Sequence, residues 1–180
     1  DYSLGGITLL CKFDGQRVTM ASQIAGADET VSSLYSVKSE QATMLSFDTY
    51  NYLVHYFGQP QGSMADDPNG TLGGDYEFVI SDATADRIEL KGKKYGNRIV
   101  MKAFSADQTW KQYLTRIKKV EDDAFFYEYD LRMDGLYTGQ MLRSNYTFIV
   151  TYYDEVGKVH QKTVPFMFTT DGMRFHEPVT

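Results

Sequence analysis

Residues 45–57 read LSFDTYNYLVHYF, and in this stretch a strand-like alternation passes directly into an aromatic loop. Leu45 and Phe47 alternate with polar residues, which is the period-2 pattern of a strand with one buried face. We therefore expect Phe47 to pack in a core, and Asp48 and Asn51 to form the turn that ends the strand. Any function of this stretch is expected in the aromatic residues that follow.

The same alternation recurs along most of the chain. Hydrophobic residues make up 42% of the 180 residues, and 14 Tyr with 11 Phe favour half-buried pleated surfaces over helices. Alternating segments joined by short connections are found at residues 7–13, 18–20, 45–47, 76–80, 88–90, 99–101, 125–133, 146–153, 164–168 and 173–176. This pattern predicts a mainly β fold, an antiparallel lipocalin-like barrel or sandwich. Pro165 has no N–H to donate, so its strand is expected to be bulged or at an edge.

One segment has a helical period instead, with apolar residues at i, i+3, i+4, i+7 and i+10: Trp110, Tyr113, Leu114, Ile117 and Val120. Ser105 or Asp107 is expected to cap its start, and Gln108 would complete a capping box with Ser105. The expected organisation is a β-barrel or sandwich module at 1–104, an amphipathic bridging helix at 105–123 and a second, smaller β module at 124–180. The modules either stand apart or pack as one domain.

Net charge excludes one class of partner. Eighteen basic and 24 acidic residues give a net charge of −6, so the chain has no global positive field to hold a nucleic-acid backbone. A local basic cluster is formed by Lys91, Lys93, Lys94 and Arg98. We interpret it as a solvated hairpin end that also discourages edge pairing. No nucleic-acid partner is expected.

No apolar run approaches the roughly 18–20 residues of a membrane-spanning helix. The chain opens at Asp1 without a signal-peptide pattern, which favours a processed or trimmed protein. Its single cysteine, Cys11, shares a strand face with Ile7, Leu9 and Phe13 and is expected to be a small buried hydrophobe. A catalytic thiolate would need a nearby base, and the sequence identifies none.

Motifs for catalysis or metal binding are missing from the sequence. His55, His160 and His176 belong to no metal-binding helix, Cys/His cluster or nucleophile elbow. Glu128 and Asp130 share a strand face at a spacing that glycosidases also use, but any polar strand face presents such pairs. We therefore predict no catalytic residues, no metal and no cofactor.

The long irregular stretch at residues 49–73 holds the candidate binding residues. Its first part is expected to form a short helix, and residues 59–73 are interpreted as flexible. Aromatic faces stack on the apolar faces of sugars and other flat ligands, and this selects Tyr50, Tyr52, His55, Tyr56 and Phe57. The more common role of such rings is simply to cover the open end of a sheet.

Several segments resemble one known family. They include FDG at 13–15, LSFDTYN at 45–51, GGDYEFVI at 73–80, LKGKK at 90–94 and FHEP at 175–178. Together they are similar to a family of Bacteroidetes lipoproteins of unknown function, domain-of-unknown-function family 4302. The resemblance implies a secreted protein of the cell envelope, anchored to the outer membrane by a lipid. It also implies that the signal peptide, the anchoring cysteine and a C-terminal portion are absent from this chain.

The resemblance transfers a cellular context but no catalytic residue. The leading functional hypothesis is a non-catalytic envelope lipoprotein that binds a glycan, a small apolar ligand or an envelope protein partner. One alternative is a hydrolase that acts on polysaccharide, with its carboxylates assembled in three dimensions. Another is a structural subunit of a surface assembly.

Overall fold

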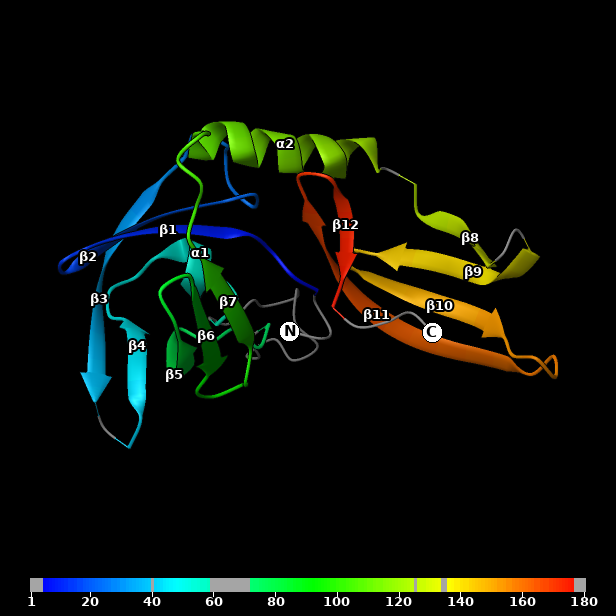
Figure 1. The fold of residues 1–180 in the computed structure, drawn as a ribbon, viewed down its shortest axis with the longest axis horizontal. Helices are drawn as coiled ribbons and strands as arrows, with labels where there is room; N and C mark the ends of the chain where they lie inside the picture. Colours follow the sequence, from blue (N-terminus) through cyan, green and yellow to red (C-terminus); the bar gives the residue numbers. More distant parts are fainter. Residues whose placement is uncertain (1–4, 40, 59–71, 125, 134–135, 177–180) are drawn as a thin grey trace. The chain divides into compact units, whose positions relative to one another are not determined.

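The computed structural model describes residues 5–39, 41–58, 72–124, 126–133 and 136–176. Two curled antiparallel sheets make up most of this part of the chain, which confirms the predicted mainly β class (Figure 1). The described residues divide into two compact units, those within 9–112 and those within 5–8 together with 113–176. The segment before the first strand therefore groups with the second half of the chain.

The first unit is a meander in which each strand pairs with the next in sequence. Its strands are β1 (Leu9–Asp14), β2 (Arg17–Ser22), β3 (Val31–Ser39), β4 (Thr43–Phe47), β5 (Glu77–Ala83), β6 (Arg87–Gly92) and β7 (Arg98–Lys102). Gly15, with φ of +58°, makes the tight β1–β2 turn that the sequence predicts. The pairing of each strand with the next is what the alternating segments of the sequence and their mostly short connections predict.

The interior of the first unit is filled with side chains. Its buried core consists of Val18, Met20, Leu45, Phe47, Leu53, Val54, Phe78 and Leu90. Phe47 is 4% exposed and meets Phe78 edge-on, with ring centroids 6.2 Å apart, so its predicted core position is confirmed. Leu53 and Val54 come from the short helix α1 (Tyr52–His55), which is the short helix expected in the aromatic loop.

The second unit contains a smaller meander. Its strands are β8 (Glu128–Met133), β9 (Leu136–Ser144), β10 (Thr147–Tyr153), β11 (Val159–Thr169) and β12 (Gly172–Phe175). The prediction that Pro165 marks a bulge or an edge is wrong, because β11 lies between β10 and β12. The ladder with β10 ends at Pro165 and the ladder with β12 begins at Phe166, so the missing N–H falls at the point where β11 changes partner.

The predicted amphipathic helix is present as α2 (Trp110–Asp123), which begins five residues later than expected. Its cap is neither Ser105 nor Asp107. Thr109 Oγ1 accepts from Gln112 N at 3.2 Å, and Gln112 Oε1 accepts from Thr109 N at 2.9 Å. This reciprocal pair is a capping box, in the S/T-x-x-E/Q form that the sequence offers one turn further on.

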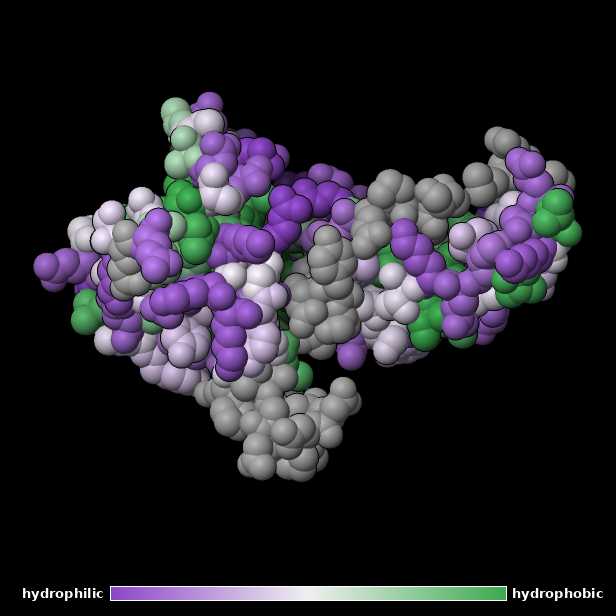
Figure 2. All heavy atoms as spheres, turned by 90° about the horizontal axis from the view of Figure 1, so that it is seen from below, coloured by the Kyte–Doolittle hydropathy of each residue, from purple (hydrophilic) through white to green (hydrophobic). Residues whose placement is uncertain are grey.

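The buried face of α2 carries Leu114 and Ile117, both 0% exposed. Within the described residues, neither helix has the length and apolar character needed to cross a membrane. Hydrophobic side chains also lie on the surface, and Figure 2 shows them in several places among hydrophilic side chains, including the end of the view at the right. Val156, in the β10–β11 turn, is 87% exposed.

Candidate functional site

The aromatic loop is fixed to the first sheet by Asn51. This residue is 0% exposed and has extended backbone angles, φ −136° and ψ 108°, at the N-cap of α1. Its Oδ1 accepts from Leu53 N at 3.1 Å, and its Nδ2 donates to Ser33 Oγ at 3.1 Å. Asn51 is thus more than the turn residue expected from sequence, because it satisfies one helix N–H and ties α1 to β3.

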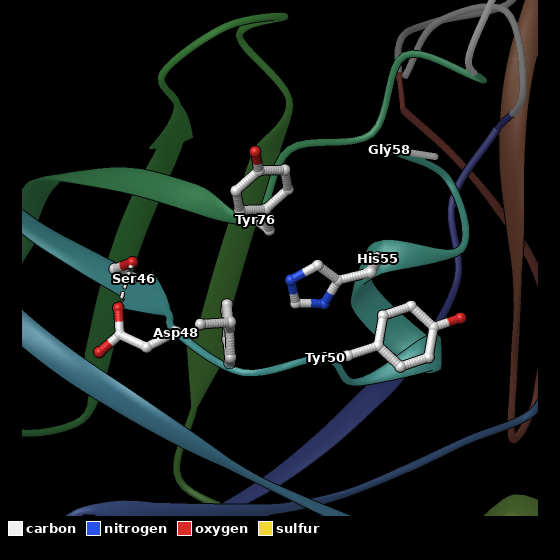
Figure 3. Close-up of a pocket in the computed structure, with 7 residues that line it drawn as sticks. Ser46, Asp48, Tyr50, His55, Gly58 and Tyr76 are labelled. Carbon is white, nitrogen blue, oxygen red and sulfur yellow. Dashed lines mark hydrogen bonds between the residues drawn. The ribbon is translucent and has the colours of Figure 1, made fainter. Parts of the chain in front are cut away.

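With Leu53 and Val54 in the core, the helix turns His55 towards the surface. The His55 ring is nearly parallel to the Tyr76 ring, with centroids 4.9 Å apart, and is tilted against Tyr50 at 5.5 Å (Figure 3). His55 Nδ1 lies 3.0 Å from Asn51 O and 3.2 Å from Asn51 N, which fixes the ring orientation. We call Tyr50, His55 and Tyr76 the aromatic row.

The aromatic row borders an open hollow of about 370 Å³. Its lining residues are Ser46, Phe47, Asp48, Tyr50, His55, Gly58 and Tyr76 (Figure 3). Tyr50 is 61% exposed and Tyr76 is 46% exposed, so two large rings lie at the surface rather than in the core. The volume is near the lower end of the roughly 300–1,000 Å³ of small-molecule sites.

Asp48 is one of the residues that line the hollow, and its carboxylate is turned towards Ser46 (Figure 3). Its Oδ1 accepts from Ser46 Oγ at 2.7 Å and pairs with Lys38 Nζ at 3.2 Å. The hydroxyl groups of Ser36 and Ser46, and then the Lys38 ammonium, lower the pKa of Asp48 from its ordinary value. The carboxylate is therefore ionised at neutral pH and acts as a hydrogen-bond acceptor.

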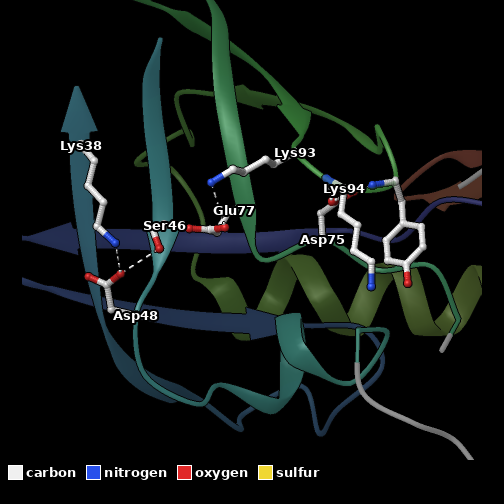
Figure 4. Close-up of polar contacts among 8 residues, drawn as sticks. Lys38, Ser46, Asp48, Asp75, Glu77, Lys93 and Lys94 are labelled. Atoms are coloured by element: carbon white, nitrogen blue, oxygen red, sulfur yellow. Dashed lines mark hydrogen bonds and ion pairs between the residues drawn. The ribbon is translucent and has the colours of Figure 1, made fainter. Parts of the chain in front are cut away.

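Asp75 holds the segment that carries Tyr76. This carboxylate is 7% exposed and accepts four hydrogen bonds from the β6–β7 turn. Oδ1 accepts from Lys94 N at 2.8 Å and Tyr95 N at 3.0 Å, and Oδ2 accepts from Asn97 N at 3.2 Å and Asn97 Nδ2 at 2.8 Å. Asp75 thus lies beside the turn residue Lys94 (Figure 4), and Tyr76 of the aromatic row is the next residue in the chain.

The sequence-selected residues separate into two groups. Tyr50 and His55 line the hollow, whereas Tyr52, Tyr56 and Phe57 do not. Tyr52 donates its hydroxyl to Glu29, and this bond is the main cause that raises the pKa of Tyr52 to about 12. Tyr56 and Phe57 meet edge-on, with ring centroids 5.2 Å apart.

Sequence reasoning missed Tyr76 as a lining residue and assigned Asp48 to a turn. Tyr76 alternates with Phe78 and so was expected to share its buried face, but β5 begins only at Glu77 and Tyr76 lies before the ladder. The available signal was GGDY at 73–76, because Gly-Gly-Asp is typical of a turn and places Tyr76 at the turn rather than inside the strand. Asp48 directly precedes the aromatic loop in the chain, and its place among the residues that line the hollow becomes visible only in the structure.

The Cys11 thiol and the His160 imidazole each contact side chains outside the hollow. Cys11 packs with Leu9 against the first core, and burial raises the pKa of its thiol to about 12. Its predicted strand neighbour Phe13 is instead 38% exposed and meets Tyr35 edge-on. His160 Nε2 lies 2.7 Å from Asp154 Oδ2 in the β10–β11 hairpin. Among the residues that the structure describes, no three His, Cys, Asp or Glu side chains gather as a metal site.

The fold and the hollow define a β-sheet protein with an open aromatic surface site. The profile of the family described as Domain of unknown function (DUF4302) matches residues 1–180, and the chain belongs to this family. No curated protein and no solved structure matches the chain.

Proposed function

We propose that this protein is a non-catalytic binding protein and that the hollow beside the aromatic row takes a carbohydrate. The observation that carries the proposal is the arrangement of Tyr50, His55 and Tyr76 as neighbouring rings, two of them well exposed, next to the ionised Asp48. Large exposed rings at a hollow are more costly in water than buried ones, and a ligand that covers them recovers this energy.

A sugar matches both parts of this surface. Its C–H faces are flat and apolar enough to pack on an aromatic ring, and its hydroxyl groups donate to a carboxylate. Asp48 Oδ1 is held in place by Ser46 and Lys38, so the acceptor is already oriented before a ligand arrives. Convergence of a few fixed polar groups with apolar walls is the usual composition of a small-molecule site.

The filled core favours a surface site over an internal one. Val18, Met20 and Leu53 are each at most 1% exposed in the first unit. A small apolar ligand of the kind that lipocalin-like barrels enclose would have to displace such side chains, at a cost of several kcal/mol. This supports a polar ligand at the hollow over an apolar one in the interior.

The hydrolase alternative needs a second carboxylate and a proton donor. Among the described residues that line the hollow, Asp48 is the carboxylate, and its pKa is lowered rather than raised. An ionised, hydrogen-bonded aspartate is suited to accept hydrogen bonds from a ligand, whereas a general acid must hold its proton near neutral pH. The balance of these properties supports binding without hydrolysis.

A glycan array followed by isothermal titration tests the proposal. The wild-type chain is expected to bind at least one saccharide, and Tyr50→Ala is expected to weaken that binding about tenfold, since ring stacking contributes on the order of 1 kcal/mol or more. Tyr52→Phe is the control, because it removes a hydroxyl that bonds Glu29 outside the hollow. Absence of any saccharide binding, or equal loss in both variants, would contradict the proposal.

We further propose that the full-length protein is a lipoprotein of the cell envelope, anchored to the outer membrane. The support is the resemblance of the chain to a family of Bacteroidetes lipoproteins. Membrane fractionation and metabolic lipid labelling of the full-length protein test this localisation. Recovery of unlabelled protein in the cytoplasmic fraction would contradict it.

One observation favours the alternative of a structural subunit. Tyr153, Val156 and Val159 are exposed by 51%, 87% and 54% around the β10–β11 hairpin. Exposed apolar groups of this kind mark contact surfaces in some proteins, although the group is small. If it mediates assembly, the wild-type chain should be larger than a monomer in light scattering, and Val156→Ser should make it monomeric.

A further inference from the structure

The His55 imidazole faces two backbone groups of one residue with its inner nitrogen. Nδ1 lies 3.2 Å from Asn51 N and 3.0 Å from Asn51 O. In a neutral imidazole one ring nitrogen carries the hydrogen and the other a lone pair, so Nδ1 either accepts from this N–H or donates to this carbonyl. If Nδ1 accepts, the hydrogen is on Nε2, and Nε2 is a donor. If Nδ1 donates, Nε2 is an acceptor.

The backbone of Asn51 decides between the two tautomers. Asn51 is 0% exposed, so water does not reach its N–H, and among the described residues His55 Nδ1 is the acceptor for that N–H. The Asn51 carbonyl already accepts from Val54 N at 3.0 Å and from His55 N at 2.8 Å, which uses both of its lone pairs. A donating Nδ1 would leave a buried N–H without an acceptor and bring a third donor to a satisfied carbonyl. Nδ1 therefore accepts, and Nε2 carries the hydrogen.

The Nε2–H group is directed into the hollow. Figure 3 shows the outer edge of the ring turned away from α1 and towards the side where Ser46 and Asp48 lie. Tyr76 stacks on the imidazole at an interplanar angle of 17°, and Tyr50 lies on the other side of the ring in the same view. The hydrogen bonds of the ring to described residues are both at Nδ1. What His55 offers to a ligand is therefore the Nε2–H edge of its ring rather than a face.

We propose that His55 is the hydrogen-bond donor of the carbohydrate site, and that the hollow selects saccharides by one hydroxyl group whose oxygen accepts from Nε2–H. The inference rests on the proposed carbohydrate function and adds the group that orients the sugar. A sugar that packs a C–H face on Tyr50 or Tyr76 carries its hydroxyl groups at the rim, within reach of an N–H in the plane of the neighbouring ring. Because Asn51 N holds Nδ1, this donor is oriented before a ligand arrives.

Nitrogen NMR tests the tautomer without any ligand. In a chain with isotope-labelled histidine nitrogens at about pH 8.5, where an ordinary imidazole is neutral, His55 Nε2 should give the signal of a protonated ring nitrogen and Nδ1 that of an unprotonated one. The His55→Gln variant identifies the His55 signals by their absence. Signals of the opposite tautomer, or of an equal mixture of the two, overturn the inference.

Deoxy analogues of the strongest saccharide from the array test the donor itself. The wild-type chain should bind one deoxy analogue about three- to tenfold more weakly than the parent sugar, the effect of one neutral hydrogen bond. His55→Phe keeps a ring beside the tyrosines but has no N–H, so it should bind the parent sugar more weakly and should not distinguish it from this analogue. His55→Gln, whose amide N–H can take the place of Nε2–H, should restore part of the distinction.

His160→Phe is the matched control. His160 also stacks on a tyrosine, Tyr152, but it belongs to the second unit and does not line the hollow, so this variant should bind both sugars as the wild-type chain does. A distinction that survives in His55→Phe, or wild-type binding that tolerates removal of each hydroxyl group in turn, overturns the inference but leaves the carbohydrate site standing. No binding of any saccharide by the wild-type chain overturns both.

Discussion

Replacement of Asp75 by alanine should destabilise the first unit strongly. The carboxylate is 7% exposed and accepts four hydrogen bonds, three of them from backbone N–H groups. At about 1 kcal/mol net for each bond the loss approaches 4 kcal/mol, and water that reaches the freed turn reduces it, so we expect about 2–4 kcal/mol. That is a large share of the roughly 5–15 kcal/mol that stabilises a typical domain.

The assay is urea unfolding followed by the fluorescence of Trp110, which belongs to the first unit. Amide hydrogen exchange at Lys94, Tyr95 and Asn97 reports the same turn directly. Asp75→Asn should cost about half as much, because one oxygen remains to accept from Lys94 and Tyr95 while its amide opposes the donors of Asn97.

The matched control is Asp82→Ala, an exposed aspartate on the neighbouring strand β5. This change should alter the free energy of unfolding by less than about 0.5 kcal/mol. If Asp75→Ala is as mild as Asp82→Ala, or if the three turn amides keep their protection, Asp75 does not organise the site and the reasoning is refuted.

Three further predictions concern the cap, a tyrosine and the thiol. Thr109→Ala should cost about 1 kcal/mol in urea unfolding and Ser105→Ala almost nothing, because only Thr109 caps α2; equal effects would contradict the capping box. Glu29→Gln should bring the pKa of Tyr52 in an ultraviolet titration from about 12 back towards 10. The stability that this hydrogen bond contributes should be present below pH 10 and should be lost as pH rises through 12. An unchanged titration would refute the pairing of Tyr52 with Glu29. Cys11 should react with iodoacetamide slowly at pH 8 and quickly in urea, since burial raises its pKa to about 12; rapid native labelling would contradict its burial.

Most of the fold could be predicted from the alternation of apolar and polar residues. Phe47 and Phe78 are buried as their period predicts, and the strands follow from pattern and turn residues. The error at Pro165 is instructive, because a strand that changes partner halfway needs no N–H at that point. The sequence indicates that Pro165 lacks an N–H donor, but only the pairing of β11 with β10 and then β12 shows that no donor is required at this position.

The site was less predictable than the fold. Tyr50 and His55 were selected because they are aromatic residues in a loop, and the same criterion also selected Tyr52, whose hydroxyl bonds Glu29 outside the hollow. Tyr76 comes 21 residues after His55 in the chain, and its position beside the His55 ring follows the bonds that hold the preceding residue, Asp75, to the β6–β7 turn. Contacts between residues that are distant in sequence produce no periodic pattern of residue types, so a single sequence does not predict them.

The central claim is that the aromatic row binds a saccharide, and a comparison of two tyrosines tests it most directly. Tyr76 is 46% exposed beside the hollow, and Tyr153 is 51% exposed on β10 of the second unit. Isothermal titration with the strongest saccharide from the array should show about tenfold weaker binding by Tyr76→Ala, while Tyr153→Ala should match the wild-type chain. Binding that survives Tyr76→Ala, or that is lost equally in Tyr153→Ala, would contradict the account.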